Sequence, residues 1–90
     1  MTETDAIRRK RLRYRSWHRG TREADLLLGR FADARLDDLD PAQLDRFEAL
    51  LDCADPDLWD WAVGRAPAPT THDHDVLALI RAFVESPPAA

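Results

Sequence analysis

The run Trp17-His18-Arg19-Gly20-Thr21-Arg22-Glu23 places a guanidinium, a glycine and a carboxylate within one turn of chain. An arginine offers a planar set of donors to carboxylates and carbonyls, and a glycine lets a second backbone approach closely. Such a set suits non-covalent docking. Acid–base chemistry at His18 is an alternative, but no serine or cysteine nucleophile has a recognisable context nearby. A catalytic role for Glu23 also stays open, beside the simpler role of a carboxylate in the first turn of a helix.

Positive charge is concentrated before Glu23, although the whole chain has a formal net charge of -4. Eight of the thirteen Lys and Arg residues lie between Arg8 and Arg22, whereas nine acidic residues and one arginine lie between Leu36 and Asp60. Folding does not require this segregation. Three explanations stay open: a solvated helix face, phosphate contacts by a small nucleic-acid-binding helical protein that uses segment 8–22, and docking on an acidic protein. The acidic remainder of the chain weighs against nucleic acid.

The length of the chain, 90 residues, suits one domain. We expect a single helical domain over residues 1–90, with an ordered core at about 7–84 and a frayed, proline-rich tail at 85–90. In so short a chain a deep active site would take up a large share of the hydrophobic core, which argues against an enzyme. Cys53 is the only cysteine, so we expect a reducing cytoplasm. No apolar run reaches the roughly 20 residues of a membrane span, so we expect no membrane insertion.

Helices must position the 17–23 run, because the sequence has neither an alternating strand pattern nor a hairpin pair. We expect a first helix over Asp5–Trp17, with Ile7 and Tyr14 on related faces. Gly20 stands where a left-handed C′ residue would end this helix, and Thr21 can cap the next one. The residues that can begin and end helices along the whole chain predict an all-α fold, a small compact bundle of four to five short helices.

Later helix starts follow the same capping chemistry. Asp-Pro pairs at 40–41 and 55–56 predict caps for a third and a fourth helix, and Thr71 or Asp73 opens a fifth. Trp59 and Trp61 point about 160° apart on a helix, so we expect one of them in the core and the other at least half exposed as a binding anchor. The alternative is that both cover a thin core.

No metal or nucleotide site is predicted. The run His72-Asp73-His74-Asp75 has side chains that can bind a metal, but no further cluster completes a zinc site. Gly20, Gly29 and Gly64 are too scattered to form a phosphate-binding loop. We therefore expect no catalytic residue, no stably bound cofactor and no metal.

The 17–23 run also resembles a known family. Arg19–Glu23 matches the RGxxE motif of the succinate dehydrogenase assembly factor 2 family, and several later blocks match in the same order. These blocks are Asp25-Leu26-Leu27-Leu28, Phe31, Phe47-Glu48-x-Leu50-Leu51 and Asp55-x-Asp57-Leu58-x-x-Trp61. The resemblance covers about Ile7 to Phe83. The family often has a second arginine before RGxxE, and here that position is His18, so its charge depends on pH.

The resemblance implies a bacterial helical protein that binds the flavoprotein subunit of succinate dehydrogenase, and in some bacteria that of fumarate reductase, and promotes covalent attachment of FAD. Such a protein acts on the FAD of its partner and is not itself an enzyme. A flavin transferase with Glu23 as catalyst is a weaker alternative. We expect a monomer when free. The predicted partner-binding residues are Arg15, His18, Arg19, Gly20, Glu23, Asp25 and Trp61.

Overall fold

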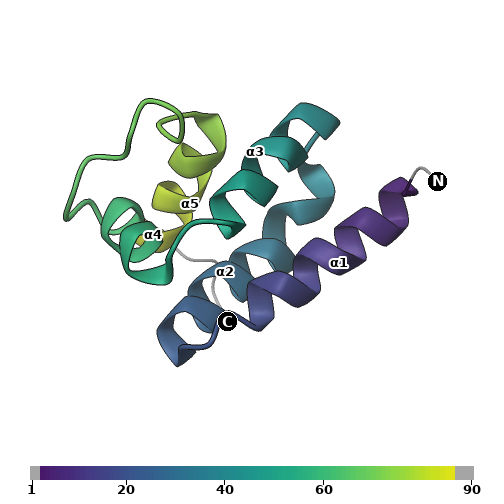
Figure 1. Ribbon diagram of the computed structural model, residues 1–90, viewed down its shortest axis with the longest axis horizontal. Helices are drawn as coiled ribbons and strands as arrows, with labels where there is room; N and C mark the ends of the chain where they lie inside the picture. Colours follow the sequence, from purple (N-terminus) through teal and green to yellow (C-terminus); the bar gives the residue numbers. More distant parts are fainter. Residues whose placement is uncertain (1–2, 87–90) are drawn as a thin grey trace. The chain divides into compact units, whose positions relative to one another are not determined.

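The computed structural model describes residues 3–86, and every regular element in that part of the chain is helical. The elements are α1 (Asp5–Trp17), α2 (Arg22–Arg35), the 3-10 helix η1 (Leu36–Asp38), α3 (Pro41–Leu51), α4 (Asp55–Ala62) and α5 (Asp75–Glu85). The all-α class and the number of α-helices are therefore confirmed (Figure 1). None of the described helices has both the length and the apolar composition that crossing a bilayer requires.

The chain divides into two helical units, the first ending at Leu39 and the second beginning at Asp40. Unit 1 contains α1, α2 and η1, and unit 2 contains α3, α4 and α5. The expectation of a single domain over residues 1–90 stays a prediction. Of the predicted tail at 85–90, Glu85 is the last residue of α5, and residues 87–90 lie outside the described residues.

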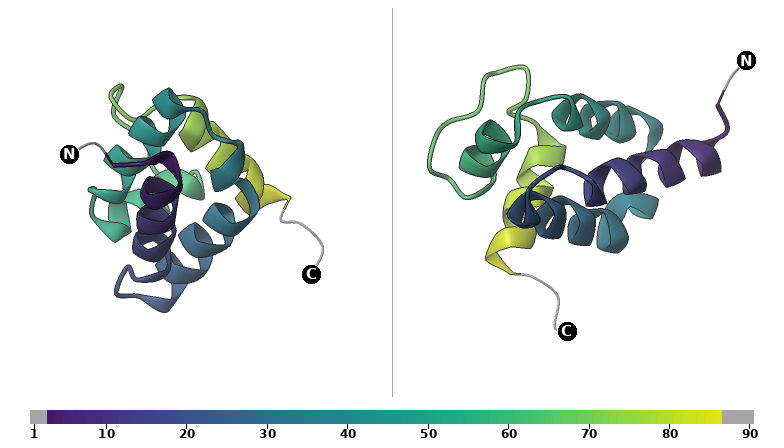
Figure 2. Two further views of the ribbon diagram at one scale, coloured as in Figure 1. Left: turned by 90° about the vertical axis from the view of Figure 1, so that its right-hand side faces the viewer. Right: turned by 60° about the horizontal axis from the view of Figure 1, so that its bottom comes forward.

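Unit 1 is built on a hairpin of α1 and α2, which lie side by side and run in opposite directions (Figure 1, Figure 2). Leu12 of α1 and both Leu28 and Phe31 of α2 are buried. The Trp17 ring lies over Gly29, where an added Cβ would come 2.2 Å from Trp17 Cδ2. The two helices can pack this closely because position 29 has no side chain.

The connection between these helices begins at His18, the C-cap of α1, and ends at Thr21, the N-cap of α2. Thr21 Oγ1 accepts a hydrogen bond of 3.3 Å from the Ala24 amide, as expected for a cap. Gly20 has a φ of 106°, so the expected positive φ is confirmed. Its place was predicted wrongly by one residue, because Gly20 lies two positions after the C-cap and Arg19 takes the C′ position.

Unit 2 begins with a capping box, in which Asp40 Oδ1 accepts from the Gln43 amide at 2.8 Å and Gln43 Oε1 accepts from the Asp40 amide at 3.0 Å. Helix α5 packs against both α3 and α4 (Figure 2). Phe47 of α3 and both Val76 and Ile80 of α5 are fully buried. These apolar positions form the core that fixes the polar residues at the start of α5.

Two caps in unit 2 differ from the prediction. The N-cap of α4 is Ala54, which offers no side-chain acceptor, and Asp55 lies inside the first turn, where its carboxylate complements the helix dipole. The N-cap of α5 is His74, not Thr71 or Asp73. His74 Nδ1 accepts a hydrogen bond of 3.2 Å from the Leu77 amide, which only a ring nitrogen without a proton can do.

Candidate functional site

The α1–α2 turn, residues 18–21, holds the centre of the predicted site. His18 is exposed, and its ring stacks on Tyr14 with centroids 3.9 Å apart and planes inclined by 17°. His18 Nδ1 lies 2.7 Å from the Tyr14 carbonyl oxygen. Since a carbonyl can only accept, Nδ1 carries a proton in this arrangement. The imidazole is therefore fixed at the end of α1 by both of its contacts.

Asp25 holds the turn from the other side. Its Oδ1 accepts a hydrogen bond of 2.5 Å from the Arg19 backbone amide, so the first turn of α2 is tied back to the connection. The carboxylate is partly buried. Asp25 was predicted as a partner-binding residue, and its observed contact is with the turn itself. It therefore positions Arg19 and Gly20, and any partner contact of this side chain stays a prediction.

Gly20 has open space beside it. Nothing lies within 4 Å of the place that a Cβ would occupy, so the glycine is needed here for its φ of 106° and not for packing within the protein. The open side of Gly20 gives another molecule direct access to the backbone of the turn.

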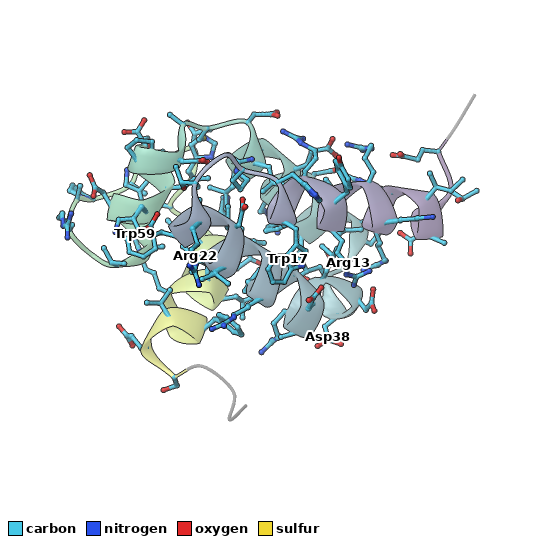
Figure 3. The ribbon with its side chains drawn as sticks, turned by 90° about the horizontal axis from the view of Figure 1, so that it is seen from below. Arg13, Trp17, Arg22, Asp38 and Trp59 are labelled. Carbon is cyan, nitrogen blue, oxygen red and sulfur yellow. The ribbon has the colours of Figure 1, made fainter. Side chains whose placement is uncertain are left out.

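Glu23 and Arg22 project from the first turn of α2, and both side chains are exposed (Figure 3 labels Arg22). Neither side chain forms a hydrogen bond or an ion pair within residues 3–86. Sequence reasoning left open whether Glu23 pairs with Arg19, and within this part of the chain it does not. The carboxylate is therefore available to another molecule.

Two further predicted residues lie elsewhere. Arg15 is partly buried on α1, where its carbonyl accepts from the His18 amide at 3.3 Å. Trp61 belongs to unit 2 and is only 9% exposed, with its ring stacked on that of His72 at a centroid distance of 5.6 Å. Trp61 is thus the core member of the tryptophan pair. Trp59 is partly exposed, less than the half that was expected of a binding anchor (Figure 3).

Several cations of the basic segment stabilise unit 1 itself, which the sequence did not indicate. Arg9 donates to the Leu36 carbonyl at 2.5 Å and to the Leu39 carbonyl at 2.8 Å. Arg13, one helical turn before Trp17 on α1, lies 3.3 Å from Asp33 and 3.4 Å from Asp37 (Figure 3). Part of the charge segregation is therefore explained by folding, because these arginines meet carbonyls and carboxylates at the far end of the hairpin.

The second polar cluster lies in unit 2 around the start of α5. Cys53 Sγ is 3.3 Å from His72 Nε2, whereas His72 Nδ1 and His74 Nε2 are buried without a hydrogen-bond partner. Burial lowers the pKa of His74 below its ordinary value of 6.5. A hydrogen bond from Gln43 lowers the pKa of Asp75, and Arg46 lowers it further. Within residues 3–86 no three His, Cys, Asp or Glu side chains are grouped so that they could hold a metal ion.

Comparison with known proteins identifies the family of the chain. Residues 10–84 match the model of the family described as "Flavinator of succinate dehydrogenase". The chain belongs to this family. The matched segment contains the whole α1–α2 turn and all of α3, α4 and α5 except the last residue of α5. The family resemblance inferred from the RGxxE motif is therefore confirmed.

Individual relatives agree with the family. The chain is 40% identical over 80 residues to the "FAD assembly factor SdhE" of Acetobacter pasteurianus, covering 89% of this chain and 71% of the relative. It is 38% identical to the mitochondrial succinate dehydrogenase assembly factor 2 of Dictyostelium discoideum, covering 89% and 57% of the two chains, and 48% identical to that of Meyerozyma guilliermondii, covering 86% and 51%. The chain thus spans little more than half the length of these two mitochondrial relatives.

Proposed function

We propose that this protein is an assembly factor that binds the flavoprotein subunit of succinate dehydrogenase and promotes covalent attachment of FAD to it. The observation that carries the proposal is the α1–α2 turn in a member of this family. The turn presents an open glycine backbone at Gly20, the first turn of α2 adds an unpaired carboxylate at Glu23, and both are fixed on a tightly packed helical hairpin. Rigid support of exposed polar groups is what recognition of a protein surface requires.

The proposed role is assistance and not catalysis. Covalent flavinylation joins a side chain of the flavoprotein to the flavin bound in the same subunit. The bound flavin itself supplies the electrophile for this bond. A small helical protein contributes by binding one conformation of the flavoprotein more tightly than the others. Gly20 would let the flavoprotein backbone approach, Glu23 would accept from its donors, and Arg19 would be held in place by the bond between its amide and Asp25.

The finer features belong to the same proposal. The protein works in the bacterial cytoplasm as a monomer when free, holds no flavin or metal of its own, and also serves fumarate reductase where a cell has it. The alternative function in nucleic-acid binding has no support. Arg9 and Arg13 of segment 8–22 are engaged by groups of unit 1, which leaves fewer cations for phosphates.

A reconstitution tests the function. The purified apo-flavoprotein subunit is incubated with FAD, with or without the protein, and covalent flavin is measured by fluorescence of the flavoprotein band after denaturing electrophoresis. We expect the protein to bind the subunit, to raise the rate of flavinylation, and to be recovered without flavin absorbance near 450 nm. The proposal fails if the rate is the same with and without the protein, or if flavin becomes covalently attached to the protein itself.

A further inference from the structure

Helix α1 carries an exposed stripe that unit 1 does not use for folding. Among the described residues three large hydrophobic side chains are exposed, Ile7 at 57%, Tyr14 at 65% and Val63 at 38%. Ile7 and Tyr14 are seven residues apart and share one face of α1, and His18 follows one turn after Tyr14. We name Ile7, Tyr14 and His18 the α1 stripe. Leu12 and Ser16, which are fully buried, lie on the opposite face.

The aromatic part of the α1 stripe is already ordered. Tyr14 stacks on His18 at 3.9 Å, and His18 is in turn held by the Tyr14 carbonyl at 2.7 Å. A tyrosine has few side-chain torsions, so a ring that is fixed before binding loses little entropy on contact with another protein. Single exposed apolar side chains are common and need no explanation. Here, however, Ile7 and Tyr14 share one helix face, and Tyr14 is also stacked on the His18 ring.

Positive charge borders the stripe. Lys10 lies between Ile7 and Tyr14 on the exposed side of α1, and its ammonium group has no partner within residues 3–86. Arg9 and Arg13 reach instead to α2, η1 and Leu39, where carbonyls and carboxylates of unit 1 bind them. Arg11 shares the face of the stripe, and its guanidinium is bound by the Glu3 carboxylate at 2.8 and 2.9 Å. The chemistry offered outward is therefore apolar and aromatic beside this ion pair, with the free ammonium group of Lys10 at one edge, and it fits a segment that bears carboxylates.

We propose that the α1 stripe is a second docking surface for the flavoprotein subunit, continuous with the α1–α2 turn through His18. The segment that it binds is acidic and places an aliphatic or aromatic side chain against Tyr14. This inference rests on the proposed function. From Ile7 to His18 the stripe extends for about 16 Å at the rise of an α-helix, which is long enough for about three turns of a partner helix. It explains why the sequence keeps apolar side chains on a face that the hairpin does not bury.

Substitution of Tyr14 tests this proposal. We expect Tyr14→Ala to raise the Kd for the purified apo-flavoprotein about tenfold and Ile7→Ser about threefold, because exposed aromatic anchors carry much of the affinity of an interface. Val63→Ser is the matched control, since Val63 is exposed but lies in unit 2, and its Kd should be unchanged. All three variants should keep the wild-type melting temperature, because none of these side chains is buried. A Kd for Tyr14→Ala within twofold of wild type overturns the proposal.

The same variants distinguish the flavoprotein from two other possible occupants of the α1 stripe. If Tyr14→Ala abolishes self-association in sedimentation velocity while flavoprotein binding is unchanged, the stripe joins two copies of this chain and the proposal is wrong. It is also wrong if a fluorescent single-stranded oligonucleotide binds wild type more tightly than the flavoprotein does and loses that binding in Tyr14→Ala. The proposed function is judged on wild type alone: if wild type binds the flavoprotein and speeds flavinylation while Tyr14→Ala does so equally well, only the stripe assignment fails.

Discussion

The α1–α2 turn and the α4–α5 loop (residues 63–74) are built from similar residues and use them in opposite ways. Each contains a glycine with positive φ, Gly20 at 106° and Gly64 at 78°, and each is followed by a helix with at least one acidic residue in its first turn. In the α1–α2 turn the imidazole of His18 is exposed. In the α4–α5 loop the imidazole of His74 caps a helix and one of its nitrogens is buried.

The difference lies in where the polar groups are directed. In the α4–α5 loop the two imidazoles are directed into unit 2, where His72 Nδ1 and His74 Nε2 are buried without a hydrogen-bond partner among residues 3–86, and Asp73 lies 3.6 Å from Arg81. The α1–α2 turn is held internally by the bond from the Arg19 amide to Asp25 and by the contact of His18 Nδ1 with the Tyr14 carbonyl, while the open side of Gly20 and the nearby Glu23 carboxylate face solvent. A connection that has an open backbone and an unpaired carboxylate directly after it, on rigid supports, is the better candidate for recognition, although both connections have suitable residues for it.

The largest expected effect concerns the packing that supports the α1–α2 turn. Gly29→Ala would place a Cβ 2.2 Å from Trp17 Cδ2, so the indole or the helices must move. We expect a loss of about 1–3 kcal/mol in the free energy of unfolding, typical of overpacking, measured by urea denaturation. In a Trp17→Leu background the same substitution should lower the free energy of unfolding by less, because the indole atoms that clash with the new Cβ are absent. Equal costs in both backgrounds would show that this contact does not hold the hairpin.

The next effect compares the two glycines directly. Gly20→Arg and Gly64→Arg both place a side chain at a positive φ with no atom within 4 Å of its Cβ, so each should lose about 1 kcal/mol of stability. Only Gly20→Arg should lower the rate of flavinylation, by about tenfold or more, because its side chain would keep the flavoprotein away from the turn. The assay is the reconstitution with covalent flavin fluorescence. Equal rates for the two variants would remove the distinction between the connections.

A smaller effect is expected from the unpaired carboxylate. Glu23→Gln should lower the rate of flavinylation about threefold to tenfold, since a charge-assisted hydrogen bond to the partner becomes a neutral one. Asp57→Asn is the matched control, because Asp57 is also an exposed acid in the first turn of a helix, α4. Both changes weaken the interaction with a helix dipole, by about 0.3–1 kcal/mol. If the flavoprotein is flavinylated at the same rate with both variants, Glu23 contributes only to the stability of α2.

Much of the fold could be predicted from the sequence because helix ends depend on local chemistry. The bounds Asp5–Trp17 and the caps at Thr21 and Asp40 follow from hydroxyl and carboxylate acceptors beside amides that lack partners. The cap of α5 was missed, because histidine can cap a helix only when its ring is neutral and tertiary packing keeps it so. Gly29 was missed as a packing residue, since its role exists only after α2 meets Trp17.

The candidate site was predictable in part. The family resemblance pointed to Arg19, Gly20 and Glu23, and the structure puts the first two in the α1–α2 turn and Glu23 in the first turn of α2 directly after it. The support by Asp25 was not predictable, because a bond from a side chain to an amide six residues earlier depends on the path of the turn. Helical spacing correctly put Ile7 and Tyr14 on related faces of α1, but which side the hairpin buries depends on α2.

The smallest expected effect concerns pH and the cap of α5. Burial lowers the pKa of His74 in the folded protein, against its ordinary value of 6.5, while Asp75 raises it and both Arg46 and His72 lower it. The unfolded chain therefore binds the proton more readily, so stability is complete above about pH 6.5 and decreases as pH falls below that value. Protonation of Nδ1 also removes the acceptor for the Leu77 amide.

His74→Asn tests this account, because an asparagine caps a helix without titrating in this range. Between pH 7.5 and pH 5.5 we expect wild type to lose up to about 1 kcal/mol, the value of one cap, and His74→Asn to lose less. His74→Ala, which has no cap at any pH, should already show the lower stability at pH 7.5. Urea denaturation at each pH gives all three values. If wild type and His74→Asn decline in parallel, the pH dependence comes from other groups, and the α4–α5 loop does not use His74 as a cap in solution.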